Sequence, residues 1–129
     1  MSIWQEFDFE QRILRILRNA KRYRTLHRFG FPFLTAYQIA IEYASRYPED
    51  FKQIERPIGG KGANISNSLT HYIAWELSKR IQSGLLPMVE GAFITPSHQV
   101  NLTFRYGKKT ITAYTGKGSR ELPLFRLRH

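Results

Sequence analysis

The chain has 129 residues, of which 42% are hydrophobic and 23% are charged, and it contains no cysteine. This length suits a single domain over residues 1–129, and the apolar fraction argues against wholesale disorder. The lack of cysteine excludes disulfides, thiol nucleophiles and cysteine-based zinc sites. No apolar run approaches the roughly 20 residues of a membrane span, and the N-terminus lacks the pattern of a signal peptide. We therefore expect a soluble, cytoplasmic protein with no membrane partner.

The formal net charge of +10 is concentrated in two segments that are far apart in sequence. Residues 1–28 contain seven Lys/Arg and three Asp/Glu, residues 91–129 contain seven and one, and residues 29–90 contain six of each. If the fold brings the two ends together, they form one cationic surface that attracts polyanions and neutralises phosphates. Nucleic acid is therefore the first candidate partner.

A first helix is predicted from Phe9 to Tyr23, with Asp8 and Gln11 spaced as a capping box. Its apolar residues recur at helical spacing on one face. A helix face that is merely solvated usually mixes charges of both signs, but here the opposite face carries arginine alone, and this indicates phosphate contacts. The residues of this arginine stripe are Arg12, Arg15, Arg18 and Arg22.

The second helix is predicted to open at Thr35, because Gln38 three residues later completes a capping box, and to end at Pro48. Residues 48–62 are expected to form a loop with one helical turn. A third helix is predicted from Ile65 or Asn67 to Gln82, with Asn64 or Ser66 as its cap. Its exposed face is polar and nearly neutral, and its candidates for nucleic-acid contacts are Asn67, Ser68, His71 and Lys79.

The remainder of the chain is predicted to be β-structure. Strands are expected over 88–94, 99–106 and 110–115, and a short final strand in the tail 122–129. The Gly-Lys-Lys sequence between the second and third of these is typical of a hairpin turn, and it makes the tip of that hairpin cationic. The candidates for phosphate contacts on this hairpin are Arg105, Lys108 and Lys109.

Three helices followed by a small antiparallel sheet with a basic hairpin make an α+β chain that resembles a winged helix-turn-helix domain over residues 34–115. The best local match is the stretch ISNSLTHYIAWELSKRIQSGLL, residues 65–86. The resemblance implies a DNA-binding fold in which one helix enters the major groove and the hairpin acts as a wing. It also implies that Asn67, Ser68 and His71 face base edges and that Lys108 and Lys109 are the wing contacts. The linker 48–62 departs from the short turn of a standard helix-turn-helix.

A second motif, I-G-x-x-G-x-x-I over Ile58–Ile65, resembles the signature loop of KH domains. The resemblance implies binding of RNA or a single strand by a loop that clamps the nucleic-acid backbone. Glycines let a backbone approach phosphate closely, and the N-terminus of the following helix offers free amides. An anion-binding loop of another kind and a flexible linker are the alternatives. The residues of this predicted phosphate loop are Gly59, Gly60, Lys61 and Gly62.

Other functional classes have less in the sequence to favour them. The histidines show no metal-ligand spacing, and no metal or cofactor is expected. Glu49, Asp50 and Lys52 resemble part of a metal-dependent nuclease site, and His71 is a candidate general base of a small ribonuclease. The Tyr-rich and Phe-rich composition suits a homodimer or a protein-interaction module for an acidic partner. The sequence favours a non-enzymatic nucleic-acid-binding protein, with DNA preferred over RNA.

Overall fold

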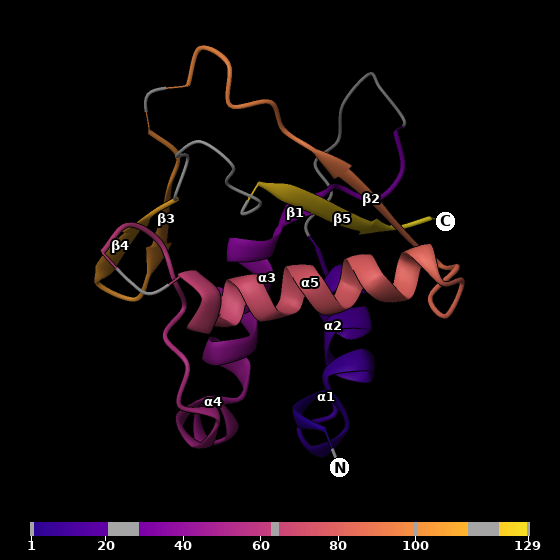
Figure 1. Cartoon of the computed structure of the whole chain (residues 1–129), viewed down its shortest axis with the longest axis horizontal. Coiled ribbons are helices and arrows are strands. Elements are labelled where there is room, and N and C mark those ends of the chain that lie inside the picture. The colour runs from indigo at the N-terminus through magenta and orange to yellow at the C-terminus, as the bar shows by residue number, and fades with distance from the viewer. Residues whose placement is uncertain (1, 21–28, 63–64, 100, 114–121, 129) are drawn as a thin grey trace.

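The computed structural model describes residues 2–20, 29–62, 65–99, 101–113 and 122–128. It confirms the α+β class (Figure 1). The helices are α1 (Ile3–Glu6), α2 (Phe9–Arg18), α3 (Ala36–Arg46), α4 (Pro48–Ile54) and α5 (Leu69–Gln82), with a 3-10 turn at Ile65–Asn67. The strands are β1 (Leu34–Thr35), β2 (Val89–Phe93), β3 (Thr103–Tyr106), β4 (Lys109–Thr112) and β5 (Pro123–Leu127).

Local capping explains where two of the long helices begin. At α3 the predicted capping box is confirmed, because the Thr35 hydroxyl accepts from the Gln38 amide and the Gln38 side chain accepts from the Thr35 amide. At α5 the cap is Ser68, whose Oγ accepts from the His71 amide. The predicted caps Asn64 and Ser66 were therefore wrong, since a 3-10 turn precedes the helix.

The start and end of α2 also differ from the prediction. Asp8 has a φ of 52° and makes no capping hydrogen bond from its side chain, so the predicted capping box is absent there. The helix ends at Arg18, five residues before the predicted Tyr23, and Asn19 is its C-cap. The short helix α1, which begins with a capping box at Ser2, was not predicted.

The strands form two separate antiparallel sheets. The larger has the order β1-β5-β2, so the C-terminal strand lies between two strands that come earlier in the chain. Phe125 opposes both Leu34 of β1 and Gly91 of β2. This sheet packs against α2, α3 and α5. Strands β3 and β4 pair only with each other, and they form a hairpin beyond the N-terminal end of α5 (Figure 1).

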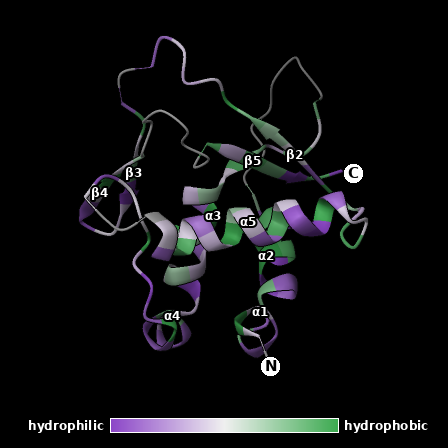
Figure 2. Ribbon diagram, viewed as in Figure 1, coloured by the Kyte–Doolittle hydropathy of each residue, from purple (hydrophilic) through white to green (hydrophobic). Residues whose placement is uncertain are grey.

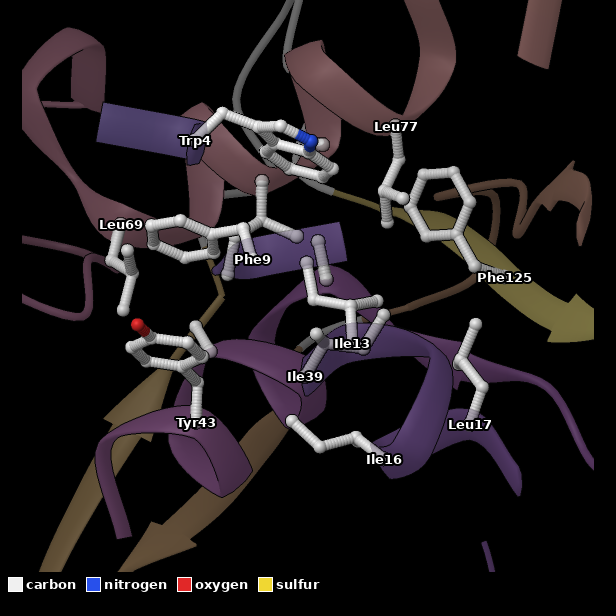
Figure 3. Close-up of a cluster of buried hydrophobic side chains, with 14 of the residues drawn as sticks. Trp4, Phe9, Ile13, Ile16, Leu17, Ile39, Tyr43, Leu69, Leu77 and Phe125 are labelled. Atoms are coloured by element: carbon white, nitrogen blue, oxygen red, sulfur yellow. The ribbon is translucent and has the colours of Figure 1, made fainter. Parts of the chain in front are cut away.

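The core lies between α2, α3, α5 and the larger sheet (Figure 3). It contains an aromatic stack in which the Phe9 ring lies 5.5 Å from Trp4 and 4.5 Å from Tyr43, centroid to centroid. All three rings are buried, and Phe9 has no exposed surface. Hydrophobic and hydrophilic residues alternate along α5, as expected for a helix with one face in this core (Figure 2).

Phe9 is expected to be a principal determinant of stability, because its ring joins α1, α2 and α3. Replacing it with alanine should lower the free energy of unfolding by about 3–5 kcal/mol, the usual cost of a large buried aromatic. Leu85→Ala is the control, since Leu85 is 69% exposed and its loss should change stability by no more than about 0.5 kcal/mol. Urea titrations followed by circular dichroism measure both, and equal effects would contradict the described core.

Candidate nucleic-acid interface

The β3–β4 hairpin presents cations without acids. Its register pairs Arg105 with Thr110 and Tyr106 with Lys109, which leaves Gly107 and Lys108 as the turn. Gly107 has a φ of 59°, a conformation that glycine adopts at little cost. Arg105, Lys108 and Lys109 are exposed, and within the described residues none of them has an ion-pair or hydrogen-bond partner. All three predicted contacts therefore remain available to an anionic ligand.

Two kinds of contact hold the base of the hairpin against the helices. Phe104 stacks on Tyr37 of α3 with centroids 5.3 Å apart, and Tyr106 meets Phe51 of α4 edge-on at 6.4 Å. The Lys61 amide donates to the Thr112 carbonyl at 2.9 Å. The loop before α5 thus fixes the hairpin at its base, at Thr112, and aromatic packing holds it as far as Tyr106, while the residues from Gly107 to Lys109 are exposed.

The predicted phosphate loop has a different role in the structure. A Cβ atom at Gly60 would lie 2.6 Å from the Thr112 carbonyl oxygen, and one at Gly59 would lie 2.9 Å from the Ser68 Cβ. These glycines therefore permit close approach of protein to protein. The space they leave is filled by β4 and by the cap of α5. Packing within the protein therefore accounts for the glycines of this loop without a bound nucleic acid.

The amides that a phosphate would need are also occupied. Leu69 and Thr70 at the start of α5 donate to the carbonyls of Pro57 and Ile58, at 2.7 and 3.1 Å. The next amide of the helix is taken by the Ser68 cap, and the Lys61 amide by Thr112. This hydrogen bonding argues against an anion held by the loop amides and helix N-terminus, and so against KH-like use of Gly59–Gly62. The exposed Lys61 side chain remains beside the hairpin.

The arginine stripe of α2 is divided by its contacts. Arg12 donates to Asp50 Oδ2 at 2.6 Å and to Tyr43 Oη at 3.1 Å, and its guanidinium lies 4.0 Å from the centre of the Tyr47 ring. Partial burial acts to lower the pKa of Arg12, but the bonds to Asp50 and Tyr43 outweigh it and raise that pKa. Arg12 therefore ties α2 to α3 and α4, and this argues against its predicted phosphate contact.

The other stripe residues are less constrained. Arg15 is exposed and donates to Tyr47 Oη at 3.2 Å. Arg18 is exposed and has no ion-pair partner in the described part of the chain. Arg22 lies outside the described residues. A hollow of about 480 Å³ joins the end of α2 to the hairpin, since Asn19, Arg46 and Arg105 all line it. The first segment of the chain and the hairpin thus approach one another at this point, but Glu42 also lines the hollow and none of Arg12, Arg15 and Arg18 does.

The C-terminal basic residues of β5 are largely neutralised. Arg126 lies opposite Glu90 in the sheet and forms an ion pair with it, and Arg128 contacts the same carboxylate at 3.1 Å. Arg126 also donates to the Phe29 carbonyl at 2.8 Å. The uncompensated positive charge of the described C-terminal segment is therefore concentrated on the hairpin.

The predicted contact residues of α5 differ in accessibility. Asn67 and Lys79 are exposed and His71 is half-buried. Ser68 has no exposed surface and caps the helix, so its burial argues against a contact with bases. Lys79 lies 3.5 Å from Glu76, which also pairs with Arg80. The exposed face therefore offers an amide, an imidazole and one partly compensated cation.

A groove of about 500 Å³ lies between α5 and the edge of the larger sheet. Two exposed aromatics line it: Trp75, whose surface is 53% exposed, and Phe93, which is 76% exposed. Trp75 lies on the face of α5 that the sequence predicts to be polar, and no sequence pattern indicated that Phe93 would be exposed. Strand alternation places Phe93 on the same side as the buried Val89, but Phe93 is the last residue of β2, an edge strand, and it is exposed.

Asp50, the central acid of the nuclease-like sequence, is paired with Arg12. Among the described residues, no three His, Asp or Glu side chains are grouped so that they could hold a metal ion.

In the same part of the chain, no helix combines the length and apolar character that a membrane crossing requires.

Comparisons of the chain with protein-family models, with curated proteins and with solved structures gave no significant match. The candidate interface consequently rests on geometry and charge.

Alanine substitutions at Gly60 and Gly62 should show whether the loop needs glycine for close packing against β4 or only for its backbone conformation. Gly60 and Gly62 have φ values of 100° and 90°, so alanine strains both backbones similarly, but only at Gly60 does a Cβ meet other atoms. Gly60→Ala should therefore cost about 1–3 kcal/mol more unfolding free energy than Gly62→Ala. Chemical denaturation of the two variants measures this difference, and equal losses would leave the loop as a linker.

The arginine stripe should likewise divide into structural and exposed members. Arg12→Ala leaves Asp50 and Tyr43 without their shared donor, and we expect a loss of about 1–3 kcal/mol in unfolding free energy. Arg18→Ala removes the same charge from the same helix and should leave stability unchanged. If the melting temperatures of the two variants fell equally, the structural role assigned to Arg12 would be refuted.

Proposed function

We propose that this chain is a DNA-binding protein that docks through α5 and the β3–β4 hairpin in the manner of a winged helix-turn-helix domain. The observation that carries the proposal is the sheet order β1-β5-β2, with a cationic hairpin in the connection between β2 and β5. In a winged helix-turn-helix domain the order is helix, strand, helix, helix, strand, wing and strand. The elements α2, β1, α3, α5, β2, hairpin and β5 follow this order.

The position of the hairpin supports a joint contact with α5. It lies beyond the N-terminal end of that helix (Figure 1), and the loop before the helix packs both on β4, at Gly60, and on the Ser68 cap, at Gly59. A helix inserted in the major groove would place its first turns near base edges, while the adjacent hairpin would meet the phosphate backbone. Asn67 in the 3-10 turn before α5 and His71 in its first turn are suited to base edges, and Lys108 and Lys109 are suited to phosphates.

The chain has features of its own within this arrangement. Helix α4 lies between the two helices that would form the helix-turn-helix, and the wing is a separate two-stranded sheet. Helix α5 also has little free charge, because Glu76 compensates Lys79 and Arg80. Affinity would therefore depend mainly on the hairpin, with Lys61 and the exposed arginines of α2 adding to the cationic field.

Removing the charge of the hairpin tip tests this proposal. Lys108→Ala combined with Lys109→Ala should weaken binding to every duplex sequence alike, because phosphate contacts carry no sequence information. The slope of log K against log salt should fall by about 1.8 in magnitude, roughly 0.9 for each lost phosphate contact. Fluorescence anisotropy with a labelled duplex at several salt concentrations measures both quantities.

Lys52→Ala provides the matched control. Lys52 is an exposed lysine on α4, which lies on the side of the molecule away from the larger sheet (Figure 1). Its replacement should leave the salt slope within about 0.3 of the wild-type value, well below the loss per phosphate contact. A slope that changes as much per charge for Lys52 as for the hairpin lysines would mean that the attraction is non-specific and the proposed docking surface is incorrect.

A further inference from the structure

The groove between α5 and the larger sheet exposes two aromatic rings that the fold does not need in that position. Trp75 projects from the middle of α5 and Phe93 stands at the end of β2, and both line the groove. In contrast, Trp4 is 4% exposed, lies 5.5 Å from Phe9 and has the Arg80 guanidinium 4.2 Å from its ring centre. In the described structure the Trp75 ring has no ring partner of this kind.

The rest of the groove is suited to an anionic and hydrogen-bonding ligand. The remaining described residues of its lining combine small apolar surfaces with side chains that donate hydrogen bonds, and none of them is a carboxylate. They are Ala74, Pro123, His71, Ser78, Lys79 and Gln82. The nearest acid on the helix, Glu76, is held by Lys79 and Arg80. The chain as a whole carries a formal charge of +10. A phosphate-bearing ligand therefore meets attraction at this groove, whereas a second copy of the chain meets repulsion.

We propose that this groove binds an unpaired nucleobase, stacked on Trp75 and bordered by Phe93, with Lys79 contacting the adjoining phosphate. The inference rests on the proposed DNA binding and names a preferred substrate: DNA with a single-stranded segment next to a duplex. Exposed aromatic rings stack on any base, because every base has a π face, and a neighbouring cation holds the backbone. Ser78 lies one turn along α5 from Trp75 and supplies a hydrogen-bonding group for the edge of the base.

Tryptophan fluorescence reports this site directly, because the other tryptophan is buried. Titration with a thymidine oligonucleotide should quench the emission of the wild-type protein. In Trp75→Phe the oligonucleotide should still bind, but the emission of Trp4 should stay constant. Quenching that persists in Trp75→Phe would place the bound base elsewhere and overturn the proposal.

Affinities for two duplexes complete the test. One is blunt-ended, and the other carries the same sequence with a ten-nucleotide single-stranded thymidine tail. The wild-type protein should bind the tailed duplex at least tenfold more tightly, and Trp75→Ala or Phe93→Ala should reduce this ratio to near one. Leu85→Ala, which removes an exposed side chain that does not line the groove, should preserve the ratio. Unchanged thermal unfolding of the variants would exclude misfolding as the cause.

The outcomes separate this proposal from the function on which it rests. Equal binding of the two duplexes by the wild-type protein would overturn the stacking site and leave DNA binding intact. Binding of neither duplex at low salt would overturn both. Concentration-dependent sedimentation of the wild-type protein that is abolished by Trp75→Ala would assign the groove to a second copy of the chain instead.

Discussion

The close packing of the loop Gly59–Lys61 against β4 determines where the hairpin lies. The hairpin belongs to a sheet of its own, and within the described residues no strand pairing connects it to the larger sheet. Its backbone is instead held by the hydrogen bond between the Lys61 amide and the Thr112 carbonyl, at a place where a Cβ on Gly60 would lie 2.6 Å from that same carbonyl oxygen. The carbonyls of Pro57 and Ile58, directly before this loop, accept hydrogen bonds from the first amides of α5, so one short segment fixes both the hairpin and the helix. The relative position of the two proposed DNA contacts therefore depends on glycines that never touch DNA.

Burial and pairing divide the cations of this chain into two groups with different roles. Arg12, Arg80 and Arg126 each combine an ion pair with an aromatic ring, and they join elements of the fold. The hairpin lysines have neither partner within the described residues. A paired and partly buried guanidinium has little to gain from phosphate, because it must first give up its carboxylate. The net charge of the chain thus overstates the charge available for binding, and the available part is localised.

Local sequence patterns were sufficient to predict several of the helices and strands, but not the long-range contacts that their side chains make. The capping box at Thr35, the hairpin around Gly107 and the final strand all follow from short-range chemistry, and the structure confirms them. The ion pair of Arg12 with a carboxylate 38 residues away has no local signal, so the arginine stripe could not be divided from sequence. The glycine loop was ambiguous for the same reason: close approach to phosphate and close approach to another strand require the same residues. The exposure of Phe93 depends on which strand lies at the sheet edge, and pairing order is set by the whole fold.

Mapping of backbone amide chemical shifts would test the docking surface most directly. The labelled protein would be titrated with a short DNA duplex at moderate salt. If α5 and the hairpin dock together, the largest shifts should occur in Thr103–Thr112 and at the exposed positions of α5, with little change in α4. Shifts that clustered on α4 and spared the hairpin, or no shifts even at low salt, would contradict DNA binding through this surface.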